Sequence, residues 1–343
     1  MTPIPPHEFA LARAEERWIV EGGEPRLLEL RAESGHAIVT EADGIVRIDA
    51  RSRAYFPTSS SYGGADDRLF AAILDALPPA RRFHVRRLLL TRSVTAMDGT
   101  TFEQAERLVT IRGGAAGIVL RLDGHAADVV FDLADLLASP QPDARPAPWR
   151  EVPLAWLRGS AAILFHEAIG HPAEVGAAPV SWPRWLRVFD DPAHDGLGAM
   201  ARDDTGRAAA AADLTAGETP HAWRREGYRD LPLRRMTNVV VRAENSGALP
   251  LPRIEIDILG GGRWDPLTDL VEIRVAAARL VESEGATPLL PFTWRARRAA
   301  IPALLAGAAG EPASYPGVLC SHEGQRIAVG SWAPVVVTRE PAE

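Results

Sequence analysis

The sequence contains no lysine, and this absence narrows the chemistry available to the chain. All 38 basic residues are arginine, so no side-chain amine is available for a Schiff base or for general-base catalysis. Asparagine is also scarce and occurs only at Asn238 and Asn245. We attribute both biases to genomic codon usage rather than to function.

Cysteine and long apolar runs are equally scarce. Cys320 is the only cysteine, which excludes an intramolecular disulfide. No apolar run approaches the ~20 residues that span a bilayer. The first 18 residues lack the basic region and apolar core of a secretory signal. We therefore expect a cytoplasmic protein that does not enter a membrane.

Acidic residues outnumber basic ones by 45 to 38, which gives a net charge of -7. This balance argues against a nucleic-acid partner or an anionic membrane, both of which need a clustered positive surface. Hydrophobic residues make up 46% and charged residues 24%, as in globular proteins. A chain of 343 residues suits two domains of ordinary size.

The N-terminal half alternates helix-like and strand-like patterns. Helix formers with helical apolar spacing predict a helix at residues 7–18, and Leu69, Ile73 and Leu77 form the apolar stripe of a second helix at 65–77. Short strands are expected at 26–31, 36–40 and 44–48, and an antiparallel meander at 84–96, 106–111 and 116–122. Residues 128–137 fit a helix or a buried strand equally well.

A proline-rich segment separates the two halves. Residues 139–149 hold four prolines, a density that blocks helices and central strands. We therefore expect an α+β protein with an N-terminal α/β domain (1–138), containing antiparallel strands, a junction (139–150) and a β-rich C-terminal domain (151–343). Within the last, the patterns predict helices at 154–169 and 295–305, a loop at 190–230, and strands at 237–242, 253–259, 270–276, 278–282, 327–330 and 334–337.

The most informative motif is FHEAIGH, in which His166, Glu167 and His171 follow an apolar run. The two histidines are spaced i and i+5, whereas zinc peptidases commonly space them i and i+4. On an ideal helix this spacing turns the side chains about 140° apart, too far for one metal. Gly170 and Pro172 favour a helix that stops at about Ile169, with His171 returning from the turn. A π-bulge is the alternative solution.

These residue types match the chemistry of a hydrolytic zinc site. Histidines bind zinc, zinc lowers the pKa of a bound water, and Glu167 stands where a carboxylate can take that water's proton. Catalytic zinc usually has three protein ligands. The candidates for the third are Cys320, His322, His194, His221 and Glu174.

The segment FHEAIGHPAE resembles the HEAxGHxxE signature of the TldD/PmbA family, in its TldD-type (HExxxH) branch. Further matches follow in order: VFDDP, ARDDTGR, RREGYRDLPLRRMTN, LGGG and LCSHEGQRIAVG. The resemblance implies a zinc metallopeptidase acting on unfolded proteins or peptides. Zinc would lie on His166, His171 and Cys320, with Glu167 as the catalytic glutamate. It also implies a homo-oligomer or a heterodimer with a TldE (PmbA)-like sister subunit.

The sequence departs from that family pattern in three respects. Pro172 occupies a place where glycine or another small residue is expected. Glu174 is followed by Val175 and Gly176, so the aspartate of the family's HxxExD is missing, and the N-terminal half looks shortened. Two other functions are therefore compatible with the sequence: a non-catalytic subunit or adaptor, and a zinc hydrolase that matures a peptide natural product.

Two polar features lie outside the motif. Asn238 is either a residue that orients a substrate backbone or, as we favour, a turn residue that opens the next strand. The pairs Asp190–Asp191 and Asp203–Asp204 are expected to be solvated turns rather than a second metal site.

Overall fold

The computed structural model describes residues 7–42, 45–54, 64–79, 81–96, 99–114, 116–122, 130, 144–148, 150–227, 230–244, 247–322 and 324–339. Strands predominate over helices. The strands are β1 (His7–Glu21), β2 (Glu24–Ala42), β3 (Ile45–Ala54), β4 (Phe83–Ala96), β5 (Thr101–Gly113), β6 (Ala116–Arg121), β7 (Leu154–Trp156), β8 (Leu186–Asp190), β9 (Ala212–Asp213), β10 (Trp223–Arg224), β11 (Leu233–Arg234), β12 (Asn238–Ala243), β13 (Arg253–Asp265), β14 (Leu270–Glu282), β15 (Gly285–Leu289), β16 (Phe292–Arg297), β17 (Leu305–His322) and β18 (Gln325–Thr338).

The helical elements are short. They are α1 (Gly64–Asp75), α3 (Ala161–Phe165), α4 (His171–Glu174), α5 (Ile301–Leu304), a π-helical turn (His166–Gly170) and 3₁₀ turns at Leu214–Ala216 and Arg298–Ala300. Helix α1 confirms the expected amphipathic helix, since Ile73 and Leu77 are buried and Leu69 packs beside them. No helix in the described part of the chain is long and apolar enough to cross a membrane.

The expected helix at residues 7–18 is wrong, because β1 is an extended strand between β2 and β4. Phe9 and Leu11 are both buried and lie two positions apart, which is the period of a strand. The segment is rich in good helix formers, but pairing on both edges outweighs that weak preference. The antiparallel β4–β5–β6 meander is confirmed.

Several C-terminal boundaries also differ from expectation. Leu154–Trp156 is strand rather than helix, and β16 occupies the first part of the expected helix at 295–305. Strand β14 covers both strands expected at 270–282, and β18 covers both closing strands. Residues 128–137 and most of the proline-rich segment lie outside the described part of the chain, so the boundary there stays a prediction.

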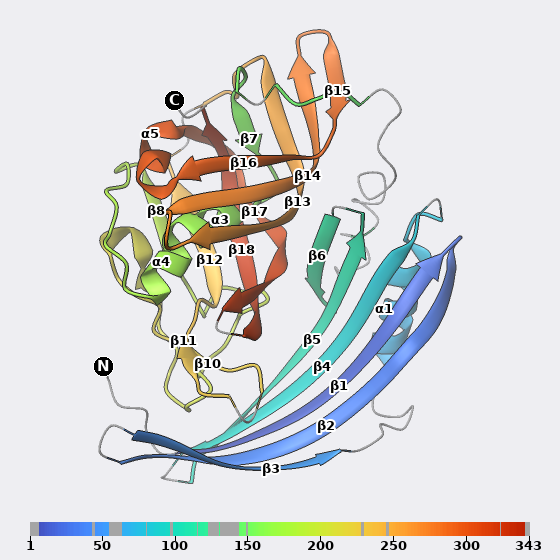
Figure 1. Ribbon diagram of the computed structural model, residues 1–343, viewed down its shortest axis with the longest axis vertical. Helices are drawn as coiled ribbons and strands as arrows, with labels where there is room; N and C mark the ends of the chain where they lie inside the picture. Colours follow the sequence, from blue (N-terminus) through green and yellow to red (C-terminus); the bar gives the residue numbers. More distant parts are fainter. Residues whose placement is uncertain are drawn as a thin grey trace.

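One continuous mixed sheet replaces the clear two-domain division that we expected. Its longest path runs β15-β14-β13-β7-β18-β17-β6-β5-β4-β1-β2-β3. Figure 1 shows β1–β5 as a long curved sheet facing the C-terminal half, with β6 between them. The β6–β17 connection is narrow, since Gly317 opposite Val119 is its single register pair.

Apolar cores join the two halves on both sides of this connection. The core beneath α1 includes Ile258 of β13, and a second core packs Phe9 and Leu11 of β1 with Ala328 of β18. The largest core surrounds α3 and buries all five of its residues. Helix α3 is therefore fixed within the C-terminal half, and it carries the FHEAIGH motif at its C-terminal end.

Candidate metal centre

The two motif histidines lie on the same side of a helix because the helix widens between them. Residues His166–Gly170 form a π-helical turn, in which the His171 N–H donates to the His166 carbonyl. An i to i+5 hydrogen bond places residues five apart one above the other. The imidazole rings are consequently 4.7 Å apart between centroids.

The helix does not end at Gly170, so the turn that we favoured is wrong and the π-bulge alternative is right. Gly170 and His171 both have right-handed helical backbone angles, and α4 continues the helix to Glu174. Gly170 is needed for space rather than for a left-handed conformation. A Cβ there would lie 1.9 Å from Sδ of Met236, whose side chain packs directly on the turn.

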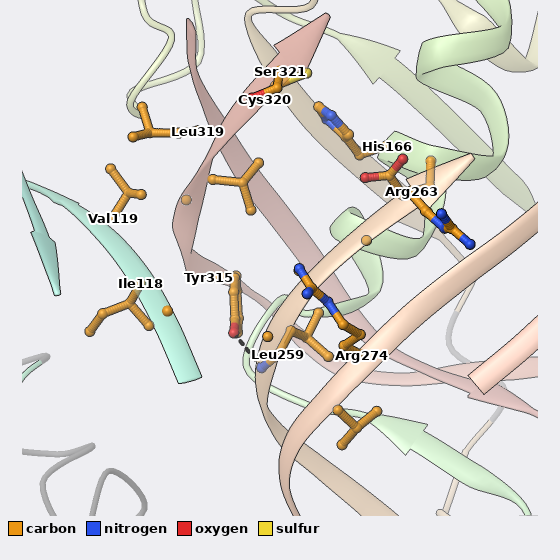
Figure 2. A pocket seen from close by; sticks show the side chains of 18 of the residues that line it. Ile118, Val119, His166, Leu259, Arg263, Arg274, Tyr315, Leu319, Cys320 and Ser321 are labelled. Atoms are coloured by element: carbon orange, nitrogen blue, oxygen red, sulfur yellow. Dashed lines mark hydrogen bonds between the residues drawn. The ribbon is translucent and has the colours of Figure 1, made fainter. Parts of the chain in front are cut away.

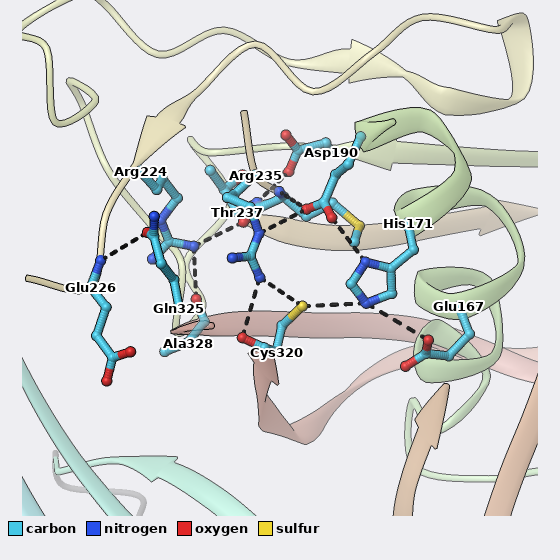
Figure 3. Close-up of polar contacts among 12 residues, drawn as sticks. Glu167, His171, Asp190, Arg224, Glu226, Arg235, Thr237, Cys320, Gln325 and Ala328 are labelled. Atoms are coloured by element: carbon cyan, nitrogen blue, oxygen red, sulfur yellow. Dashed lines mark hydrogen bonds and ion pairs between the residues drawn. The ribbon is translucent and has the colours of Figure 1, made fainter. Parts of the chain in front are cut away.

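Cys320 of β17 completes a group of three possible ligands with the two histidines. The ligand atoms of His166, His171 and Cys320 all lie within 4.8 Å of one another. The Cys320 sulfur is 3.4 Å from Nε2 of His171 (Figure 3). Nδ1 of His166 is buried without a hydrogen-bond partner, as expected of a nitrogen next to a ligand site.

The other candidate ligands separate into two kinds. His322 and Glu174 form a second possible group with His171, so His322 remains a local competitor of Cys320. His194 stacks against Trp332, and neither it nor His221 belongs to a possible ligand group among the described residues.

Glu174 and Arg235 form a buried ion pair beside these candidate ligands, and Figure 3 shows Arg235 next to Cys320. Oε2 of Glu174 is 2.9 Å from Nδ1 of His171, which turns Nε2 toward Cys320. Arg235 donates to Glu174 and also, over 2.9 Å, to the Cys320 sulfur. Histidine ligands are typically oriented by such a carboxylate. The sequence assigned no role to Arg235, because nothing in its pattern distinguishes it from the adjacent Arg234.

The charge states differ sharply between the two histidines. Burial, reinforced by the nearby His171, lowers the pKa of His166 well below its usual value, so its ring is neutral. Burial would also lower the pKa of His171, but hydrogen bonds with Cys320 and Glu174 raise it well above the usual value. Burial opposes ionisation of Glu174, yet its contacts with His171 and Arg235 lower its pKa to about 2.

Glu167 faces the same space from the π-helical turn. Its side chain is buried, and one carboxylate oxygen has no hydrogen-bond partner. Burial and the nearby Glu174 raise its pKa to about 7, although His171 and the Trp264 N–H act in the opposite direction. A Cβ on Gly262 would lie 2.7 Å from Cγ of Glu167. Glycine in the LGGG segment therefore leaves room for the Glu167 carboxylate where β13 passes over it.

A cavity of about 1000 Å³ opens onto these residues between the two halves of the molecule. Its lining includes Glu167 and His171, together with His166 and Cys320, which are labelled in Figure 2. The LGGG segment of β13 forms one wall, and residues 116–119 of β6 form another. A chain of several residues fits a space of this size.

Asn238 has a structural role, as favoured from the sequence. It opens β12, and its buried side chain accepts from the Gly198 N–H and donates to the carbonyls of Asp191 and His194. The expectation of solvated turns is wrong for three of the four aspartates, because Asp190, Asp203 and Asp204 are buried. Asp190 binds the N–H and hydroxyl of Thr237 and so fixes the start of β12.

Neither a protein-family profile nor a curated protein matches this sequence. Solved structures do match. TldE from Thermococcus kodakarensis superposes with a TM-score of 0.67 at 14% identity, covering 97% of this chain and 95% of that one. A proposed modulator of DNA gyrase from Thermotoga maritima gives 0.64 at 10% identity, covering 97% and 94%. A similarly described protein from Bacteroides thetaiotaomicron gives 0.56 at 10%, also covering 97% and 94%.

These likenesses show that the chain has the fold of TldE. Because they extend over nearly the whole of each chain, neither half of this protein is abbreviated relative to those three structures. At 10–14% identity they say nothing of a metal or of catalysis. Any assignment of activity must therefore rest on the site itself.

Proposed function

We propose that this protein is a zinc-dependent peptidase that hydrolyses peptide bonds in unfolded proteins or peptides. His166, His171 and Cys320 would hold the zinc, and Glu167 would be the general base. The observation that carries the proposal is the convergence of these four side chains on one cavity from positions as far apart as 166 and 320.

The donor set fits zinc. Two imidazole nitrogens and one thiolate suit this metal, and three protein ligands leave one position open for chemistry. The neutral His166 ring has a buried nitrogen without a partner. Arg235 donates a hydrogen bond to the Cys320 sulfur and would offset part of the negative charge of a zinc-bound sulfur. Zinc bound here would supply a Lewis acid that polarises the scissile carbonyl and lowers the pKa of water.

Glu167 is suited to move the proton that hydrolysis requires. Its carboxylate would take a proton from the water that attacks the carbonyl carbon. It would then deliver that proton to the amine nitrogen as the C–N bond breaks. Burial raises the pKa of Glu167 above the usual value in the metal-free protein, and this favours its acceptance of a proton. The unpartnered carboxylate oxygen is available for this exchange.

Strand β13 supports a peptide as the substrate. It pairs with β14 along its length, but its pairing with β7 ends at Ile256. Among the described strands none pairs with the other edge of residues 259–265. Residues 259–264 of this segment line the cavity. An extended peptide can add to such an edge through main-chain hydrogen bonds, whatever its side chains. Glu167 lies beside this edge at Gly262.

Two alternatives draw on the same fold. A non-catalytic subunit or adaptor is compatible with the likeness to TldE, since that likeness shows the fold alone. Retention of the whole ligand group together with Glu167 favours an enzyme instead. A zinc hydrolase that matures a peptide natural product would use the same machinery on a different peptide. Through the family resemblance we also propose a cytoplasmic location and assembly as a homo-oligomer or with a TldE (PmbA)-like subunit.

The test combines metal content with one substitution. Purified protein should bind one zinc ion and cleave an unfolded protein. Glu167→Gln should retain the zinc and lose activity by at least ~100-fold, the usual contribution of a general base. Glu284→Gln, at an exposed turn, is the control and should change neither. Full activity of the Glu167→Gln protein, or wild-type protein without zinc affinity, would refute the proposal.

A further inference from the structure

The cavity contains two arginines whose positive charges are not paired with any residue that the structure describes. Arg274 of β14 and Arg112 of β5 line it, and the guanidinium group of neither makes a hydrogen bond or an ion pair with any described residue. Both side chains are exposed to the cavity solvent. Arg263 is a third lining arginine, but it forms an ion pair with Glu272.

The balance of charge in the cavity is opposite to that of the molecule. The chain as a whole carries a net charge of -7. Within the described part of the chain, the charged lining residues, histidines aside, are three arginines and Glu167, and Glu167 is the proposed base. A cleft lined by one sign of charge with low-dielectric walls focuses its field and concentrates ligands of the other sign. The cavity is thus an attractive site for anions within an acidic protein.

The side chain of Arg274 is placed for binding by a particular glycine. Arg274 pairs with Gly261 across the β13–β14 ladder, and its Nη2 would lie 3.0 Å from a Cβ at that position. Because Gly261 has no side chain, the guanidinium can cross over β13 into the cavity, on the side of Tyr315 (Figure 2). Gly261 also has a φ of 116°, which favours glycine. Arg112 lies on the opposite wall, which belongs to the N-terminal sheet.

We infer that the cavity selects peptides that carry a carboxylate, which Arg274 and Arg112 bind while the peptide lies along β13. Guanidinium groups bind carboxylates through paired N–H donors, which gives orientation as well as attraction. Two sources of carboxylate satisfy this chemistry: an Asp or Glu side chain, and the C-terminus of the peptide. This inference rests on the proposed peptidase function and names its substrate class.

Binding is measured separately from cleavage. The Glu167→Gln protein, loaded with zinc, is titrated with fluorescent peptides of one length that differ in a single feature. One pair compares Glu with Gln at an internal position, and a second compares a free with an amidated C-terminus. We expect the carboxylate form of at least one pair to bind about fivefold more tightly, as for a single ion pair worth ~1 kcal/mol. The preferred pair identifies the source of the carboxylate.

Substitutions then assign the preference to residues. Arg274→Gln, in the same Glu167→Gln background, should reduce the preference to less than twofold, and Arg112→Gln should reduce it in part. Arg263→Gln is the matched control, because it removes the same charge from the same cavity but from an arginine that already has a partner. It should leave the preference within about twofold of the starting protein. Raising the salt concentration should weaken the preference, since a part-exposed pair is screened.

The outcomes separate this inference from the proposed function. If wild-type protein cleaves neutral and acidic peptides at equal rates, and the binding preference is absent, the inference fails while the peptidase proposal stands. An equal loss of preference in the Arg263→Gln control would also overturn it, because the effect would then follow net charge alone. If no peptide is cleaved but the carboxylate preference persists, the peptidase proposal fails and the anion site remains.

Discussion

At the scale of single residues, the sequence pointed to the candidate ligands but not to the residues that contact them. His166, Glu167 and His171 were recognisable from residue type and spacing, and Cys320 was singled out by resemblance among five candidates. The structure brings them together. Arg235 and the supporting role of Glu174 were not predictable, because they depend on how the segment before β12 packs against α4. Arginine in a sequence with 38 basic residues gives no signal by itself.

Arg235 should control the affinity of the site for metal. It donates to the Cys320 sulfur and to Glu174 while fully buried. Arg235→Gln removes this positive charge, so the Cys320 sulfur and the Glu174 carboxylate each lose a hydrogen-bond donor. Loss of an outer contact of this kind typically weakens metal binding 10–100-fold. We expect a weakening of that order, measured by competition for zinc with a chromophoric chelator.

The adjacent Arg234 provides the control for this experiment. Its guanidinium lies over the Trp223 ring and within hydrogen-bond distance of Thr219. Arg234→Gln should therefore leave zinc affinity unchanged within about twofold. Circular dichroism of both proteins would establish that they are folded. Unaltered zinc affinity in a folded Arg235→Gln protein would show that Cys320 needs no support from this residue.

At the scale of secondary-structure elements, strands with a clear alternation of apolar and polar residues were easier to recognise than β1, which was expected to be a helix, or the irregular helix of the motif. The β4–β5–β6 meander was predictable because its strands alternate clearly and are separated by turn residues. The π-helical turn remained one of two solutions. Residue spacing showed that the helix had to change, but the choice depended on Met236, a residue 66 positions after Gly170 that packs against it. Such contacts between distant segments have no local sequence signal.

Gly170 and Met236 should therefore be energetically coupled. Gly170→Ala places a methyl group where the Met236 side chain lies, which should destabilise the fold by about 1–3 kcal/mol through overpacking. Met236→Ala should cost about 2–5 kcal/mol through the cavity that it leaves. In the double variant the new methyl group enters that cavity. The combined loss should then be smaller than the sum by ~1 kcal/mol or more.

Urea denaturation of the four proteins in this cycle measures the coupling, with tryptophan fluorescence as the signal. Zinc affinity provides a second measurement, because displacement of the π-helical turn moves His171 relative to His166. Gly170→Ala alone should weaken zinc binding, and adding Met236→Ala should restore part of it. Additive losses of stability, without recovery of zinc affinity, would mean that Gly170 serves the turn through its own backbone rather than through this contact.

At the scale of the whole molecule, the arrangement of the two halves was the least predictable feature. Composition indicated a break near the proline-rich segment, and we expected two domains. The structure instead continues one sheet from β5 through β6 to β17 and shares apolar cores across the boundary. The decisive contacts join residues such as Val119 and Gly317, which are nearly 200 positions apart. No periodic pattern within either half records that pairing.

Gly317 should be critical to this connection, and it provides a direct test of it. A Cβ there would lie 2.6 Å from the Val329 carbonyl and 2.0 Å from Leu197, so β17 has to shift to accept one. Gly117 on the β6 side would meet only Arg112, at an ordinary 3.8 Å. Both glycines line the cavity.

We therefore expect Gly317→Ala to cost about 1–3 kcal/mol of unfolding free energy, and Gly117→Ala less than ~1 kcal/mol. Because the cavity lies between the halves, Gly317→Ala should also weaken peptide binding, whereas Gly117→Ala should not. If both variants match the wild type in urea denaturation and in peptide titration, the β6–β17 contact does not fix the walls of the cavity, and the shared cores alone hold the two halves together.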